Sequence, residues 1–348
     1  MLNVKKIAGY IMPFFAGIIG VAGLFIWSGT GSVIAGIAGI LAFVIFFDFA
    51  LRKSGKIIDR KFKIKTWVKH TCMILLTVLD LFAPICGLIY VSQDSMIFYN
   101  IDSPESREYL QGRPGYREIK FTAGNGKTYH GMMYQANEND QKAPLVIYFG
   151  GNGEVSYINL RMRETNGQWA YFAGYNYLFI DYEGYGLNDG RAHYLNMYEQ
   201  SLAIYDYAAT LPNVDSSRIV AMGYSLGTGS AVYLAANRPV SGLILAAPYA
   251  NGYDFYNGAL PIFAGPMKFL VRQKLPSDKY VPKVKCPVLI IASRNDEVIP
   301  FSSSERLSKL FSSTDNIDFM ELSDALHNYI FQSSGVFDRV RSFLDEIA

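Results

Sequence analysis

Three long apolar runs lie within the first 92 residues and limit what that part of the chain can form. They cover residues 7–27, 32–51 and 71–92. The first run contains no charged residue, the second contains only Asp48, and the third contains only Asp80. Each run is long enough to cross a bilayer at ~1.5 Å of rise per helical residue. The sequence therefore predicts three transmembrane helices. A cleaved signal peptide is the alternative for the first run, although the apolar stretch is longer than such peptides need.

Charge divides the chain at the same place. Residues 1–92 hold ten Lys and Arg against three Asp and Glu, whereas residues 93–348 hold 22 against 27. Eight of the ten basic residues lie in the loop 52–69, and a short basic loop between spans is expected on the cytoplasmic side. Lys5 and Lys6 favour that side for the N-terminus, so three crossings place residues 93–348 outside the cytoplasm. Attraction to anionic lipid explains the basic loop better than nucleic acid, and no nucleic-acid partner is expected.

These patterns predict two domains in a multi-pass protein of the cell membrane. The first is a three-helix membrane anchor over 1–92, and the second is a large extracytoplasmic domain over 93–348. The three cysteines form no disulfide framework, which fits a bacterial surface. We interpret Asp80 as a neutral group that bonds between helices, with a proton or ion path as the alternative. Nothing in the sequence indicates an oligomeric state.

Strands and helices alternate in the large domain from residue 118 onward. Such alternation predicts a mostly parallel sheet with helices on both faces, and residues 92–100 before it are expected to form a first strand or a tether. The expected strands cover 118–123, 127–135, 144–151, 175–186, 218–225, 241–249, 286–296 and 316–324. The expected helices cover 196–211, 226–237, 302–313 with a serine cap, and 336–347.

Residues 223–227 read Gly-Tyr-Ser-Leu-Gly and separate a buried-strand pattern from a helix. This context is typical of a nucleophile elbow, in which Ser225 stands on a sharp turn at the carboxyl edge of the sheet. Gly223 and Gly227 are needed because a Cβ at either position would crowd the adjacent backbone. A serine in an ordinary glycine-rich loop is the alternative.

A nucleophilic serine needs a base, and the base needs a carboxylate that orients it. Among four histidines, His327 alone follows the last predicted strand, which is where the base of a strand–serine–helix site is expected. Asp296 ends an earlier strand, lies between Ser225 and His327 in sequence, and is the predicted acid. Glu297 and Asp324 are its rivals.

The site also needs two donors for an oxyanion. One predicted donor is the backbone N–H of Leu226, at the start of the helix that follows the serine. The second is the backbone N–H of Asn152 in the loop Gly-Gly-Asn-Gly-Glu, with Gly151 or Gly153 as alternatives and a simple glycine turn as the competing interpretation. This chemistry requires no metal and no cofactor.

With these residues in place, positions 93–348 resemble the α/β-hydrolase superfamily. The motifs that carry the resemblance are QDSMIFYN, YFGGNGE, DYEGYGLNDG, GYSLGTGSA, PVLIIASRNDEVIP and ALHN. The chain looks most like the membrane-anchored branch, which includes acyl-protein thioesterases and lysophospholipid lipases. The resemblance implies an α/β-hydrolase fold and a Ser-Asp-His hydrolase of acyl esters, thioesters or amides. The chain departs from the family pattern at Gly150, where His is common, and at Glu183, where Arg is common.

The segment 250–285 is expected to form a small cap over the site. Its apolar part, residues 260–271, is interpreted as a wall for an acyl chain that faces the membrane, or alternatively as a helix packed in the core. The predicted function is therefore a membrane-anchored serine hydrolase that cleaves acyl esters or thioesters of lipid or lipid-modified substrates. The alternatives are a peptidase or aminopeptidase, for which Glu183 could receive the substrate amine, and a catalytically inactive surface binding protein.

Overall fold

The structure describes the large domain almost completely and little of the chain before it. It is a computed structural model, and the described residues are 98–136, 141–259, 263 and 265–347, with scattered positions between 67 and 97. Contacts between residues divide the chain into two units, Met1–Gln93 and Asp94–Ala348. The fold described below is that of the second unit.

The predicted membrane spans lie wholly or largely outside the described residues. The runs 7–27 and 32–51 contain no described position, and 71–92 contains only isolated ones. No helix within the described part of the chain is both long enough and apolar enough to cross a membrane. The three transmembrane helices, and Asp80 within the third, stay predictions.

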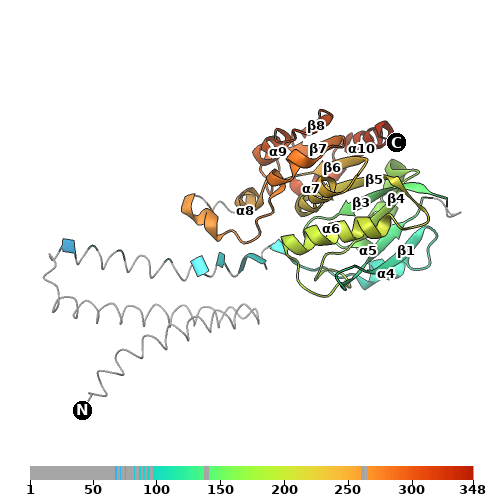
Figure 1. The fold of residues 1–348 in the computed structure, drawn as a ribbon, viewed down its shortest axis with the longest axis horizontal. Coiled ribbons are helices and arrows are strands. Elements are labelled where there is room, and N and C mark those ends of the chain that lie inside the picture. The colour runs from blue at the N-terminus through green and yellow to red at the C-terminus, as the bar shows by residue number, and fades with distance from the viewer. Residues whose placement is uncertain are drawn as a thin grey trace, which may run out of the picture. The chain divides into compact units, whose positions relative to one another are not determined.

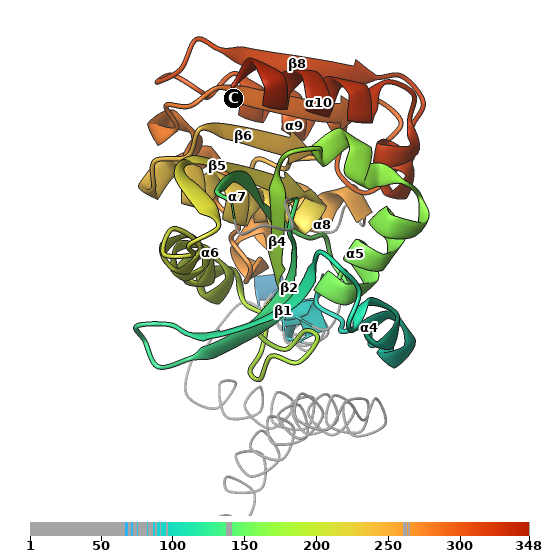
Figure 2. The same ribbon diagram turned by 90° about the vertical axis from the view of Figure 1, so that its right-hand side faces the viewer.

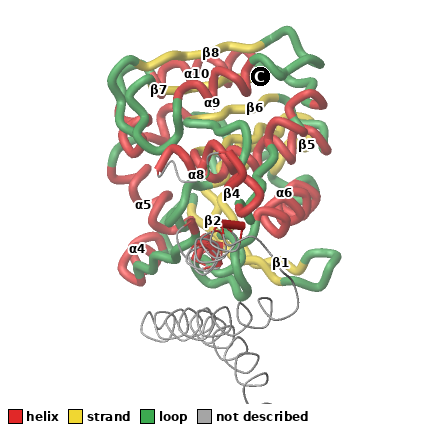
Figure 3. The backbone as a smooth tube through the Cα atoms, turned by 90° about the vertical axis from the view of Figure 1, so that its left-hand side faces the viewer, coloured by secondary structure: helices red, strands yellow, loops and turns green. Residues whose placement is uncertain are grey.

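One eight-stranded sheet forms the centre of the second unit (Figures 1 and 3). The strand order is β1-β2-β4-β3-β5-β6-β7-β8, and every pair from β4 to β8 is parallel, whereas β2 pairs antiparallel with both β1 and β4. The prediction of a mostly parallel α/β sheet is confirmed. The strands are β1 Tyr116–Thr122, β2 Thr128–Tyr134, β3 Ala143–Phe149, β4 Asn176–Ile180, β5 Val214–Tyr224, β6 Gly242–Ala246, β7 Val288–Ser293 and β8 Ile317–Leu322.

Helices cover both faces of this sheet. Figure 2 shows α6 and α5 on opposite sides of it, and α7 packs against α6 and against β5 and β6. All residues of β3, β4, β6 and β7 are buried, because each of these strands has neighbours on both sides and helices on both faces. The helices are α4 Pro104–Leu110, α5 Ser156–Thr165, α6 Tyr194–Ala208, α7 Thr228–Asn237, α8 Gly252–Ala259, α9 Phe301–Ser308 and α10 Val336–Glu346.

Two local predictions differ from the structure, and a third is narrowed. The described positions within 92–100 form no strand, which leaves the tether of the two expectations. β7 ends at Ser293, so Asp296 lies in the loop beyond the strand. The predicted serine cap is wrong, because α9 begins at Phe301 after Pro300, which has no side chain able to cap it. The nearby serine hydroxyls bond elsewhere, since Ser303 donates to the carboxylate of Asp254 and Ser304 donates to a backbone carbonyl.

A buried carboxyl group joins the end of β4 to the start of α5, a helix that sequence patterning did not predict. Asp181 Oδ1 accepts the Ser156 N–H at 2.6 Å, and Oδ2 accepts the Ser156 hydroxyl at 3.1 Å. Burial raises the pKa of Asp181 to about 7, although both bonds from Ser156 act in the opposite direction. The Asp181 carboxyl group therefore holds the start of α5 beside the loop that follows β3. It becomes protonated as the pH falls below about 7.

Replacing this carboxyl group should flatten the pH dependence of stability. With its pKa raised, native Asp181 binds more protons than the unfolded chain between about pH 4 and pH 7, so its contribution is lost as the pH rises through that window. Asp181→Asn is neutral throughout, so it should remove up to about 3 kcal/mol of the change in stability between pH 5 and pH 8, about 1.4 kcal/mol for each pH unit below the native pKa. Urea unfolding at pH 5 and pH 8 measures this, with the exposed Asp315→Asn as the matched control. Equal slopes in wild type and Asp181→Asn would contradict the assignment.

Candidate active site

The serine of the Gly-Tyr-Ser-Leu-Gly motif stands on a strained turn between a strand and a helix. β5 ends at Tyr224, a 3₁₀ turn η2 covers Ser225–Gly227, and α7 begins at Thr228. Ser225 has φ 49°, a left-handed value that is unusual for a residue with a side chain. Such strain persists only where the surroundings enforce it, and it is the backbone conformation of a nucleophile elbow.

The two motif glycines let this turn pack against neighbouring backbone. A Cβ at Gly227 would lie 2.0 Å from the carbonyl oxygen of Phe149 and 2.6 Å from that of Gly150. A Cβ at Gly223 would lie 2.7 Å from Thr228 Cα. No side chain fits at either position, so the glycines serve the tight turn for which the sequence predicted them.

The structure brings Ser225, His327 and Asp296 together in one hydrogen-bonded line. Ser225 Oγ lies 2.8 Å from His327 Nε2, and His327 Nδ1 lies 2.8 Å from Asp296 Oδ2. A carboxylate only accepts hydrogen bonds, so Nδ1 carries a proton and Nε2 presents the lone pair that can accept the serine proton. The side chains of His327 and Asp296 are only 7% and 2% exposed, which removes most competing water from their interaction.

Two neighbouring acidic residues in the loop after β7, Asp296 and Glu297, make different contacts. Asp296 Oδ1 also accepts the N–H groups of Val298 and Ile299, at 2.9 and 2.7 Å. The rival Glu297 accepts the backbone N–H of His327 at 2.9 Å, so it supports the base without touching the imidazole. Sequence reasoning missed this role, which adjacency to Asp296 could not reveal.

The remaining candidates lie outside the line of three residues. The Asp324 carboxylate accepts a bond from its neighbour Ser323 and, among the described residues, makes no hydrogen bond with His327. His193 caps α6 by accepting the Leu195 N–H at its Nδ1, and burial lowers the pKa of this imidazole. The ring of Tyr224 stacks on His327 at 5.4 Å and its hydroxyl donates to the His327 carbonyl.

Leu226 and the loop that contains Asn152 both lie next to Ser225. Leu226 is the second residue of η2, where N–H groups at a helix start have no partner within the helix. A Cβ at Gly151 would lie 3.6 Å from that of Ser225, so the loop after β3 reaches the nucleophile. The Gly151 N–H already donates to Glu154, which removes it as a donor, whereas the Asn152 N–H has no acceptor among the described residues.

Both departures from the family pattern have physical explanations in the structure. A Cβ at Gly150 would lie 2.5 Å from Phe179 Cζ and 2.9 Å from Glu154 Oε2, so this loop has no room for histidine there. Glu183 is buried, and its carboxylate accepts bonds from Lys127, Tyr129 and Asn196. That carboxylate is therefore fully engaged and does not offer a free acidic site.

Comparisons with known proteins agree with this fold. The Dienelactone hydrolase family matches residues 192–341. The chain is 28% identical to the Mycobacterium tuberculosis protein Rv2307c over 237 residues, which cover 68% of this chain and 81% of that protein. It is 29% identical to the α/β hydrolase domain-containing protein aho-3 of Caenorhabditis elegans over 170 residues, 49% of each chain. The Pyrococcus furiosus esterase Pf2001 superposes with a TM-score of 0.58 at 16% identity, covering 72% of this chain and 96% of the esterase.

The fold, the elbow and these matches together define the class. The family match, the relatives and the solved structures support an α/β-hydrolase superfamily member. Hydrolase chemistry on this fold is the kind of function that the matches support.

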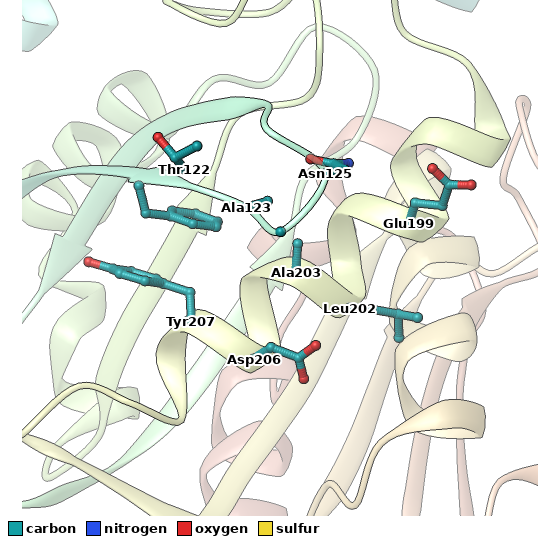
Figure 4. A pocket seen from close by; sticks show the side chains of 10 residues that line it. Thr122, Ala123, Asn125, Glu199, Leu202, Ala203, Asp206 and Tyr207 are labelled. Carbon is teal, nitrogen blue, oxygen red and sulfur yellow. The ribbon is translucent and has the colours of Figure 1, made fainter.

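Two hollows in the described part of the chain flank the β1–β2 hairpin and contain none of the predicted site residues. The larger, about 350 Å³, lies between the hairpin turn and α6. Figure 4 shows Ala123 and Asn125 of the turn on one side of this hollow and Ala203 and Tyr207 of the helix on the other. The other, about 220 Å³, includes Asp181. Neither presents the serine–histidine pair, so the site stays at the end of β5.

Replacing Asp296 and its rival Asp324 one at a time tests which of them orients His327. Asp296→Asn keeps the shape but no longer fixes the Nδ1–H tautomer, so kcat of ester hydrolysis should fall by about 10³- to 10⁴-fold. Asp324→Asn is the matched control and should change kcat by less than about threefold. Steady-state kinetics with a chromogenic ester measures both. Comparable losses in the two variants would contradict the assignment of the acid.

Proposed function

We propose that this chain is a membrane-anchored serine hydrolase that cleaves acyl ester or thioester bonds, with lipid or lipid-modified molecules as substrates. The observation that carries the proposal is the pair of 2.8 Å contacts from Ser225 Oγ to His327 Nε2 and from His327 Nδ1 to Asp296. Three residues that are 102 and 31 positions apart in sequence meet with the polarity that acyl transfer requires.

Acylation begins with Ser225 Oγ attacking the acyl carbonyl carbon while its proton passes to His327 Nε2. The carbonyl oxygen becomes an oxyanion that the N–H groups of Leu226 and Asn152 stabilise. His327 is then an imidazolium beside the Asp296 carboxylate, which favours the charged ring. This ring returns its proton to the leaving alcohol or thiol as the tetrahedral intermediate collapses to an acyl-enzyme.

Deacylation repeats these steps with water as the nucleophile. His327 takes a proton from water, the hydroxide adds to the acyl carbon, and the same two N–H groups receive the second oxyanion. Collapse releases the carboxylic acid, and the proton on His327 returns to Ser225 Oγ. No metal or cofactor enters either half of this scheme.

Membrane attachment rests on the sequence. The apolar runs 7–27, 32–51 and 71–92 and the basic loop 52–69 support three spans with that loop in the cytoplasm. The hydrolase domain would then face outward. Its lack of a disulfide framework fits a bacterial cell membrane.

The cap supports the choice of substrate. Between β6 and β7 the chain forms α8 and the short 3₁₀ helices η3 Gly265–Leu270, η4 Ser277–Lys279 and η5 Val281–Lys283. Phe269 in η3 is 72% exposed, and the ammonium of Lys268 lies over the ring of Tyr253. An exposed aromatic side chain beside a basic one suits contact with acyl chains and anionic headgroups.

The alternatives have less support. A peptidase that binds a substrate amine needs a free acidic group, and the Glu183 carboxylate is engaged by three donors. An inactive binding protein gives no reason to keep Ser225 strained at φ 49° within 2.8 Å of a buried histidine.

Covalent labelling of intact expressing cells tests the nucleophile and the topology together. A membrane-impermeant fluorophosphonate should label wild type but not Ser225→Ala, because only an activated, externally placed serine reacts. Labelling that appears only after lysis would keep the nucleophile and invert the topology. A folded wild-type protein that never labels would refute the enzyme and favour the binding-protein alternative.

The substrate class predicts a dependence on acyl length. The purified full chain in mixed micelles should show a kcat/KM at least about tenfold higher for a dodecanoyl than for an acetyl p-nitrophenyl ester, because each buried methylene contributes about 0.8 kcal/mol. Phe269→Ser should reduce this preference, and Met162→Ser on exposed α5 surface is the matched control. A preference for the acetyl ester would rule out the lipid substrate.

A further inference from the structure

Residues 97–102, which we call the linker, lead from the apolar N-terminal region into the hydrolase domain and pass over the proposed oxyanion loop. The Tyr99 backbone N–H donates to Asn152 Oδ1 at 3.4 Å. The Tyr99 ring occupies the space beside Gly153, since a Cβ there would lie 2.6 Å from Tyr99 Cε2. One linker residue therefore contacts two consecutive residues of the loop.

The same asparagine side chain is held from a second direction. The Tyr185 hydroxyl donates to Asn152 Oδ1 at 2.8 Å. Tyr185 is itself 1% exposed, so it offers a fixed support. The Asn152 side chain is thus held between the linker and the loop after β4, while its own N–H stays available.

The linker is attached at further points along its length. Asn100 Oδ1 accepts the Gly186 N–H at 3.0 Å, and the Asp102 carboxylate accepts the hydroxyl of Tyr157 in α5. Just before the linker, Asp94 accepts a bond from Gln273 in the cap at 2.7 Å. These contacts fix the linker relative to α5, the loop after β4 and the cap.

We propose that Tyr99 is a positioning residue for the oxyanion loop, so that the segment joining the N-terminal region to the hydrolase domain forms part of the active site. This rests on the proposed function in one respect, the use of the Asn152 N–H as an oxyanion donor. Tyr99 acts through Asn152 and Gly153 and touches no reacting atom. The loop has two glycines before Asn152 and one after it, so its backbone is permissive around the internal bond from the Gly151 N–H to Glu154, and an outside contact helps to fix where the Asn152 N–H points.

A displaced donor lowers transition-state stabilisation more than substrate binding. Removing one oxyanion donor outright costs about 10²- to 10³-fold in kcat, and loosening it should cost less. Tyr99→Ala should therefore lower kcat for p-nitrophenyl butyrate by about tenfold and change KM by less than about twofold. Tyr99→Phe keeps the ring and should restore kcat. Tyr109→Ala removes a tyrosine of α4 away from the loop, and is the matched control.

Amide exchange gives a readout that does not depend on turnover. In the full chain, hydrogen–deuterium exchange of the peptide over 150–155 should be at least about threefold faster in Tyr99→Ala, and unchanged in Tyr109→Ala and Ser225→Ala. Unchanged exchange and kcat in Tyr99→Ala would overturn the inference, as would a loss that Tyr99→Phe does not restore. Faster exchange in a protein without esterase activity would support the positioning role and refute the proposed function.

Discussion

The contact of Gly227 with the end of β3 is the constraint on which the rest of the site depends. β3 and β5 are parallel neighbours in which Phe149 pairs with Gly223, so the two strands end at the same level of the sheet. The turn after β5 then packs directly on the carbonyls of Phe149 and Gly150. Because this packing leaves no space for a side chain, the nucleophile and the oxyanion loop hold a fixed separation. The sheet register itself therefore sets the distance between Ser225 and the loop that we propose stabilises the oxyanion.

The acid–base pair depends on how its buried charge is compensated. Burying a carboxylate costs several kcal/mol unless hydrogen bonds replace its lost hydration. Asp296 receives two backbone N–H groups as well as the His327 ring, so its charge is compensated before any substrate binds. Glu297 fixes the histidine backbone from the same loop. One short loop thus orients the imidazole at both its ring and its main chain, and little reorganisation is left for the transition state.

The sequence predicted those parts of the fold and site that depend on local pattern or on chain order. Buried parallel strands are continuous apolar runs, and the order serine, acid, histidine identified residues that meet in space. Helix α5 was missed because it is polar, and the charge of its buried Arg163 is accommodated by bonds to Asn159, Tyr177 and Gln168. The predicted serine cap of α9 was wrong because the nearby serine hydroxyls donate to groups outside the helix, the Asp254 carboxylate and the Pro248 carbonyl. The contact between Asn152 and Tyr99 could not be predicted, because the two residues are 53 positions apart and no local sequence pattern links them.

The loop at Gly150 shows how one structural requirement is met by different residues. Where the family commonly has histidine, this chain has Gly150, and the Glu154 carboxylate fills the space beside it. This carboxylate accepts the Gly151 N–H at 2.7 Å and the Tyr148 hydroxyl at 2.9 Å. That bond engages the Gly151 amide, whereas the next amide, of Asn152, has no acceptor among the described residues. The acid fixes the loop from inside the fold, and the linker contacts it from outside. In the proposed mechanism, a donor held from both sides would already be in place when charge develops on the substrate oxygen, which is the condition under which backbone N–H groups lower an acyl-transfer barrier.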